Sequence, residues 1–132
     1  MKRAAFIGTG NMGGALARAA VRALGPDRVV LSNRTAAKAE ALAAELGCAA
    51  ADNDRAVREA EYIFLGVKPH LMAGLLEELA PVLADLHAAG EDRVLVSMAA
   101  GKQIADLRPH LAGAGYGVPL LRIMPNTCVA IR

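Results

Sequence analysis

The residues best suited to chemistry lie near the amino terminus, where Gly8-Thr9-Gly10-Asn11-Met12-Gly13 forms the pattern G-x-G-x-x-G. An apolar run, Ala4 to Ile7, precedes it, and residues at helical spacing follow it as far as Leu24. In a strand–turn–helix unit the three glycines allow a tight turn, backbone approach to a pyrophosphate, and close packing of helix on strand. The free N–H groups of the helix attract phosphates. The spacing therefore predicts a dinucleotide site.

The segment Ser32-Asn33-Arg34-Thr35 indicates which dinucleotide is bound. Domains that prefer NAD place an Asp or Glu about 20 residues beyond the glycines to bind the ribose 2′-hydroxyl. Here that position is Asn33, and Arg34 can offer a planar, charged fork to a 2′-phosphate. We therefore expect NADP(H), with NAD(H) as the alternative. The competing interpretation is that Arg34 is a solvated residue at the start of a helix.

Two further segments follow apolar runs, Val67-Lys68-Pro69 and Met98-Ala99-Ala100-Gly101. Ligands of open parallel sheets bind beyond the carboxyl ends of the strands, near the switch in strand order. Both segments are therefore expected to line the nicotinamide half of the site, although Lys68 is equally well explained as a surface charge. Asp52-Asn53-Asp54 is expected to supply caps for a short helix, and from sequence alone Asn53 is interpreted as a cap rather than a ligand contact.

Strands and helices alternate along the chain, which predicts a doubly wound, mainly parallel α/β sheet with helices on both faces, a Rossmann-like fold. The predicted strands are 4–7, 28–32, 48–51, 62–67, 93–98 and 118–124, and an extended piece begins at 129. The predicted helices are 15–24, 36–46, a short helix ending at 60, a long helix from Pro69, and 102–111, which Pro109 should end or bend.

Composition excludes several classes of function. The 132 residues suit one domain, and the net charge of +2 comes from interspersed charges that give no basic face for nucleic acid. No apolar run is long enough to span a membrane, so a cytoplasmic protein is expected. Cys48 and Cys128 lack ligand spacing and are expected to be buried thiols. The three histidines, His70, His87 and His110, form no metal-binding or catalytic pattern.

Taken together, the motifs resemble the N-terminal part of pyrroline-5-carboxylate reductase. The matching segments are Phe6 to Gly13, Ser32 to Arg34, Val67 to Pro69, Met98 to Gly101 and Arg122 to Thr127, in that order. The resemblance implies NADPH-dependent reduction of the C=N bond of 1-pyrroline-5-carboxylate to L-proline, in proline biosynthesis. It implies cofactor contacts at Ile7, Gly8, Thr9, Gly10, Asn11, Met12, Asn33, Arg34, Asn53, Gly66, Val67, Lys68, Pro69, Met98, Ala99 and Ala100.

The family continues into a helical C-terminal domain that forms a dimer and supplies much of the imino-acid pocket. Residues 1–132 are thus expected to be the NAD(P)-binding domain of a homodimer or higher oligomer, and to be inactive alone. No catalytic residue is assigned. One departure is Cys128, where the family usually has proline. The alternatives are a β-hydroxyacid-dehydrogenase-like or F420-type NADP oxidoreductase, or a non-catalytic nucleotide-binding module.

Overall fold

The computed structural model describes residues 2–99 and 101–123 and contains six strands in one parallel sheet. The strands are β1 (Lys2–Ile7), β2 (Val29–Ser32), β3 (Ala49–Ala50), β4 (Ala60–Leu65), β5 (Val94–Ser97) and β6 (Leu120–Arg122). The α-helices are α1 (Asn11–Leu24), α2 (Ala36–Leu46), α3 (Asn53–Glu59), α4 (Pro69–Ala88) and α5 (Ile104–Leu107), and the 3₁₀ helices are η1 (Pro26–Arg28) and η2 (Arg108–Ala114).

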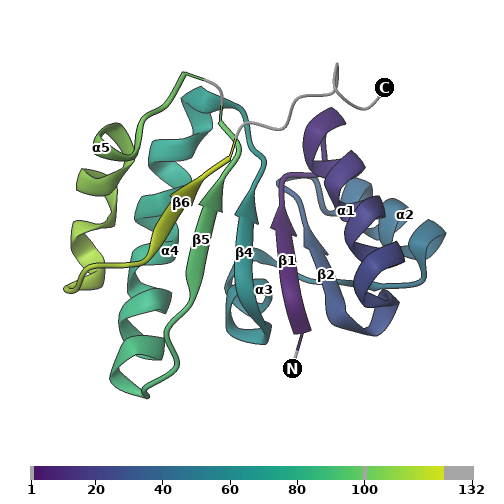
Figure 1. The fold of residues 1–132 in the computed structure, drawn as a ribbon, viewed down its shortest axis with the longest axis horizontal. Helices are drawn as coiled ribbons and strands as arrows, with labels where there is room; N and C mark the ends of the chain where they lie inside the picture. Colours follow the sequence, from purple (N-terminus) through teal and green to yellow (C-terminus); the bar gives the residue numbers. More distant parts are fainter. Residues whose placement is uncertain (1, 100, 124–132) are drawn as a thin grey trace.

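The sheet order is β3-β2-β1-β4-β5-β6, and every neighbouring pair is parallel (Figure 1). The chain moves outward from β1 in one direction and then resumes on its other side at β4. The switch point of the sheet therefore lies between β1 and β4, where ligands of such folds bind. The predicted Rossmann-like α/β fold is confirmed.

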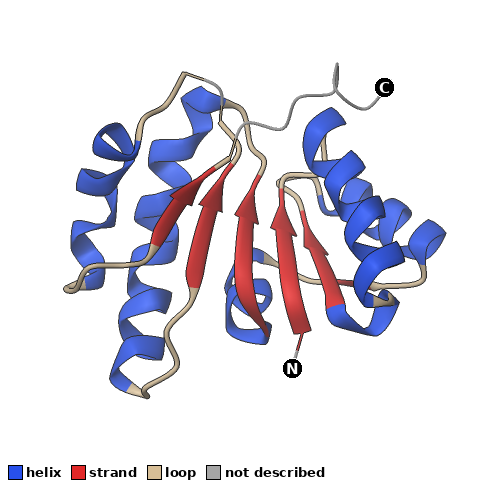
Figure 2. Cartoon of the chain, viewed as in Figure 1, coloured by secondary structure: helices blue, strands red, loops and turns tan. Residues whose placement is uncertain are grey.

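Side chains from successive residues of β1 enter two different cores. Ala5 and Ile7 pack with residues of α3 and α4, whereas Ala4 and Phe6 pack with residues of α1 and α2. Phe6 also stacks on Phe64 of β4, with ring centroids 4.8 Å apart. Such burial on both faces explains why the strands read as continuous apolar runs. Figure 2 shows the sheet with its helices.

Most predicted elements are present, and the differences have local causes. The bounds of α2 and the start of α4 are as predicted. The central strand begins at Ala60 rather than Tyr62, because Ala60 already pairs with Lys2 of β1. The predicted helix 102–111 begins later, at Ile104, and its α-helical part ends at Leu107, as expected from Pro109. It continues as the 3₁₀ helix η2, because Pro109 lacks an N–H for α-helical bonding. The segments predicted beyond residue 123 lie outside the described residues.

Arg93, the residue before β5, has a buried guanidinium that contacts the end of α3. The side chain is 2% exposed, and it donates to the carbonyl oxygens of Val57 (2.9 Å), Arg58 (2.7 Å) and Glu91 (2.9 Å). Val57 and Arg58 belong to the last turn of α3, whose carbonyls have no partner within the helix. Arg93 therefore caps α3 and ties it to the start of β5.

We expect Arg93→Met to lower the free energy of unfolding by about 2 kcal/mol, since buried carbonyls lose a charged donor. Chemical denaturation of both chains measures the difference. Arg55→Met is the matched control: its ion pair with Glu59 is largely exposed, with 72% of the Arg55 side chain accessible, and its loss should cost less than about 0.5 kcal/mol. Equal losses in the two variants would show that Arg93 does not cap α3.

Candidate cofactor-binding site

Three glycines bring the ends of β1, α1 and β4 into backbone contact. Gly8 has φ +91°, and a Cβ there would lie 2.8 Å from the backbone of Gly66. A Cβ on Gly13 would lie 2.2 Å from the carbonyl oxygen of Gly8, and one on Gly66 would lie 2.9 Å from that same oxygen. The predicted tasks of Gly8 and Gly13, a tight turn and close packing of helix on strand, are confirmed.

At Gly10 the glycine-rich turn has open space, and at Thr9 it has a hydroxyl without a partner in the described part of the chain. A Cβ on Gly10 would meet nothing within 4 Å, and Gly10 is the N-cap of α1, which has no acidic residue in its first turn. Thr9 Oγ1 is buried without a hydrogen-bond partner among the described residues. A helix N-terminus without an acidic residue in its first turn, beside a hydroxyl that can donate, fits a pyrophosphate, because N–H groups and the helix dipole favour an anion there.

Asn33 holds this turn against the end of β2. Its Oδ1 accepts from the Thr9 N–H at 3.1 Å, and its Nδ2 donates to the Thr35 carbonyl at 3.2 Å. Thr35 itself is exposed and is the N-cap of α2, without a side-chain capping bond. Asn33 therefore links the glycine turn to the start of α2, a structural role that was not predicted from the sequence.

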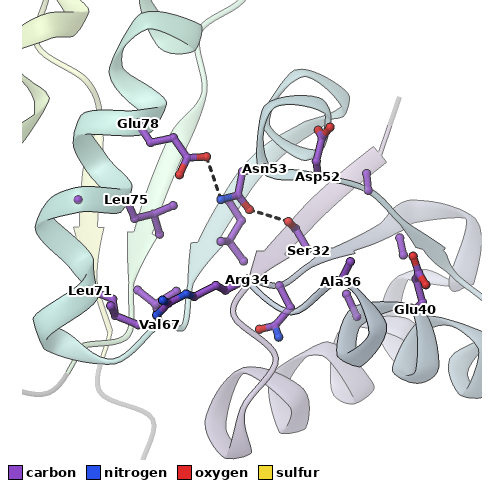
Figure 3. A pocket seen from close by; sticks show the side chains of 16 residues that line it. Ser32, Arg34, Ala36, Glu40, Asp52, Asn53, Val67, Leu71, Leu75 and Glu78 are labelled. Carbon is purple, nitrogen blue, oxygen red and sulfur yellow. Dashed lines mark hydrogen bonds between the residues drawn. The ribbon is translucent and has the colours of Figure 1, made fainter.

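A pocket of about 690 Å³ opens beside the turn, at the carboxyl ends of β1, β2 and β3 and just beyond β4 (Figure 3). It is lined by Ile7, Ser32, Asn33, Arg34, Ala36, Ala39, Glu40, Ala50, Ala51, Asp52, Asn53, Val67, Leu71, Gly74, Leu75 and Glu78. In Figure 3, Arg34 reaches across towards Val67 and Leu71 of the facing wall. One part of the pocket, here called the apolar slot, is lined by Val67, Leu71 and Leu75. Several charged side chains line the rest.

The structure brings five of the predicted cofactor residues into this pocket: Ile7, Asn33, Arg34, Asn53 and Val67. Arg34 is exposed, and its guanidinium makes no hydrogen bond or ion pair within the described part of the chain. It is therefore available to an anionic group of a ligand.

The other predicted residues that the structure describes do not line this pocket. Lys68 and Pro69 are exposed at the start of α4. Met98 and Ala99 are 8% and 3% exposed, so they can offer little more than backbone to a ligand. The Met98 N–H donates to the Leu65 carbonyl at 3.0 Å, which places this segment beside Gly66. Asn11 and Met12 begin α1, and Ala100 lies outside the described residues.

Of the three residues expected to cap α3, Asp52 does so, and the interpretation of Asn53 as the cap is wrong. The N-cap of α3 is Asp52, whose Oδ1 accepts from the Arg55 N–H at 2.8 Å. Asn53 is the first helical residue, and its amide faces the pocket, where it bonds to Ser32 and Glu78. Asp and Asn are about equally favourable at an N-cap. The sequence therefore could not show which of two adjacent residues, Asp52 or Asn53, caps α3.

Sequence reasoning missed the carboxylates of the pocket. No acid follows β2 directly, but Glu40, Asp52 and Glu78 all line the wall from other elements. A 2′-phosphate would therefore meet no carboxylate directly after β2, but it would share the pocket with these three acids. The signal for Glu78 was available in the sequence: Leu71, Leu75 and Glu78 are spaced i, i+4, i+7 and share one face of α4.

None of the three histidines lines this pocket, nor does Cys48, and Cys128 lies outside the described residues. His87 and His110 pair with Asp92 and Glu77, each at 2.7 Å. Within residues 2–99 and 101–123, no three His, Cys, Asp or Glu side chains are grouped so that they could hold a metal ion. Cys48 is half-buried rather than buried, and this partial burial raises the pKa of its thiol. None of the helices in those residues is both long and apolar enough to cross a membrane.

The strand order and the glycine turn at its switch point define a Rossmann-like domain of the kind found in nicotinamide-dependent oxidoreductases. Residues 3–101 match the family described as NADP oxidoreductase, coenzyme F420-dependent, and the chain belongs to that family.

Relatives within this broad group agree with the resemblance found in the sequence. The chain is 35% identical over 129 residues to pyrroline-5-carboxylate reductase of Corynebacterium melassecola, covering 96% of this chain and 46% of the relative. The solved pyrroline-5-carboxylate reductase of Coxiella burnetii has a TM-score of 0.82 at 26% identity, covering 98% of this chain and 46% of that one. An imine reductase from Myxococcus stipitatus, in complex with NADP⁺, has a TM-score of 0.68 at 28% identity, covering 91% and 39%.

These comparisons confirm the resemblance to pyrroline-5-carboxylate reductases. The chain spans about half the length of the relatives it matches.

Proposed function

We propose that this chain is the NADP(H)-binding domain of a pyrroline-5-carboxylate reductase, an oxidoreductase that reduces the C=N bond of 1-pyrroline-5-carboxylate to give L-proline. The observation that carries the proposal is the glycine turn, fixed by Asn33 beside a pocket that Arg34 enters without a partner among the described residues. The reaction is supported by relatives of that name that match 96% of the chain.

The residues present suit each part of the dinucleotide. Gly8 to Gly13 and the N-terminus of α1 would hold the pyrophosphate, and Asn33, Arg34 and Thr35 would face the 2′-phosphate. Asn53 and the apolar slot would take the adenosine. The segments Gly66 to Pro69 and Met98 to Ala100 would lie on the nicotinamide side.

When bound, NADPH supplies the hydride for the imine carbon. The task of this chain is to hold and orient that donor and to exclude water from its face. Orientation is served by the rigid meeting of Gly8, Gly13 and Gly66, which leaves little freedom for the ends of β1 and β4. No described residue is assigned a proton-donor role, and the imino-acid pocket and the dimer remain predictions.

The reaction is tested by assaying the natural protein that carries this chain for substrate-dependent loss of NADPH absorbance. We expect 1-pyrroline-5-carboxylate to support turnover with the highest kcat/KM. A preference for oxidised coenzyme F420 or for oxidation of 3-hydroxy acids would contradict the proposed substrate.

The F420-type reaction is the second candidate, because the family that matches residues 3–101 is described by that cofactor. A module that binds nucleotide without catalysis would give no turnover with any of these substrates. The cytoplasmic location expected from the sequence also stays a prediction.

A further inference from the structure

Three hydrogen-bonded side chains cross one wall of the pocket and connect three elements. The Ser32 hydroxyl, at the end of β2, donates to Asn53 Oδ1 at 2.6 Å. Asn53 Nδ2 in turn donates to Glu78 Oε2 of α4 at 3.1 Å. Figure 3 shows Asn53 between the two partners, with Arg34 lower in the pocket. These two hydrogen bonds thus connect a buried hydroxyl, that of Ser32 at 1% exposure, to the exposed carboxylate of Glu78.

Of the two partners, only Glu78 can decide which way the amide of Asn53 points. An ionised carboxylate accepts hydrogen bonds and cannot donate them, so it must face the NH₂ group of the amide. A hydroxyl can donate to the amide oxygen or accept from the amide nitrogen, so Ser32 suits either orientation. Glu78 therefore turns Nδ2 towards α4 and leaves Oδ1 for Ser32.

We propose that Glu78 is a positioning residue, which fixes the Asn53 amide so that its second Nδ2 hydrogen is offered to an acceptor atom of adenosine. The proposal rests on the proposed function, since it presupposes a dinucleotide in the pocket. Asn53 and Glu78 both line that pocket, together with the apolar side chains of Leu71 and Leu75. The ring nitrogens of adenine are acceptors only, so they need a donor such as Nδ2. An amide oxygen in its place could pair only with the ribose hydroxyls or the exocyclic amino group.

A direct effect of charge predicts a different outcome. If the carboxylate of Glu78 acted mainly by repelling a 2′-phosphate, its removal would tighten NADPH binding and leave NADH unchanged. Positioning of Asn53 concerns the adenosine that NADPH and NADH share. Loss of Glu78 should then weaken both nucleotides by the same factor.

The test measures dissociation constants of NADPH and NADH for Glu78→Ala, Asn53→Ala and the double variant. We expect Glu78→Ala to raise both constants about tenfold, the loss of one well-placed hydrogen bond. In the Asn53→Ala background, Glu78→Ala should change binding less than twofold, because its effect passes through Asn53. Glu78→Gln keeps an acceptor oxygen for Nδ2 and should stay within threefold of the original chain.

The matched control is Glu77→Ala, one residue earlier on α4. It removes the same charge, but Glu77 does not line the pocket and pairs instead with His110. We expect Glu77→Ala to leave both constants unchanged. Additive losses in the double variant, or tighter NADPH binding by Glu78→Ala, would overturn the positioning role.

A second measurement needs no nucleotide. In the unliganded chain, the side-chain NH₂ resonances of Asn53 should shift in Glu78→Ala and stay in place in Glu77→Ala. Unchanged resonances in Glu78→Ala would overturn the proposal even if nucleotide binds. Failure of the original chain to bind either nucleotide would instead contradict the proposed function, while the resonances would still show whether Glu78 orients Asn53.

Discussion

Replacing Gly13 with alanine should lower the free energy of unfolding by about 3 kcal/mol, the upper range for overpacking a rigid interior. The added Cβ would lie 2.2 Å from the carbonyl oxygen of Gly8 and 3.9 Å from Gly66 Cα. Both neighbours are backbone atoms, so no side chain can rotate away. The first turn of α1 must then move from β1, which also spoils the phosphate site. Chemical denaturation measures the loss of stability, and nucleotide titration measures the loss of binding.

Gly10→Ala is the matched control within the same motif. A Cβ there meets nothing within 4 Å, and the backbone of Gly10 at φ −71° suits any residue. Stability should fall by less than about 1 kcal/mol, while the new methyl group faces the space reserved for the pyrophosphate and weakens nucleotide binding. Equal losses of stability in the two variants would show that Gly13 has no special packing role.

Arg34→Asp should raise the dissociation constant of NADPH about 100-fold and change that of NADH less than threefold. The variant removes a guanidinium that has no partner among the described residues and places a carboxylate at the end of β2, beside Glu40 and Asp52 in the pocket wall. A 2′-phosphate meets repulsion there, whereas a 2′-hydroxyl gains an acceptor. Titration with both nucleotides at low and high salt measures the change.

Arg28→Asp makes the same charge change at the other end of β2. Arg28 is exposed in η1 and does not line the pocket, so its substitution should affect both nucleotides equally and weakly. If Arg34→Asp instead weakens NADPH and NADH by the same factor, Arg34 does not face the 2′-phosphate.

The glycine turn could be predicted from the sequence because its chemistry is local. Gly13 packs on the carbonyl oxygen of Gly8, five residues away, and the strand and helix that flank the turn carry clear periodic patterns. The close approach of Gly8 to Gly66 is a long-range contact that the turn itself does not reveal. The sequence also predicts that the segments after β4 and β5 lie at the same edge of the sheet as the glycine turn, since parallel strands bring their carboxyl ends to one edge.

The far wall of the pocket could not be predicted in the same way. Glu78 reaches Asn53 across 25 positions of sequence, and their contact depends on how α4 packs beside α3. The capping of α3 by Asp52 and the change from α5 to η2 at Arg108 likewise depend on small differences between neighbouring residues. Intrinsic helix propensity predicts the exact end and type of such short helices poorly, because tertiary contacts of similar energy compete with it.

The most direct test of the central claim is titration of the 132-residue chain with NADPH and NADH, with backbone resonances assigned. We expect saturable binding of one nucleotide per chain, with NADPH at least tenfold tighter than NADH. The largest shifts should fall on Gly8 to Gly13, Asn33, Arg34 and Asn53. Absence of saturable binding, or shifts confined to the opposite end of the sheet around Asp27 and Glu91, would contradict a dinucleotide site at the β1–β4 switch point.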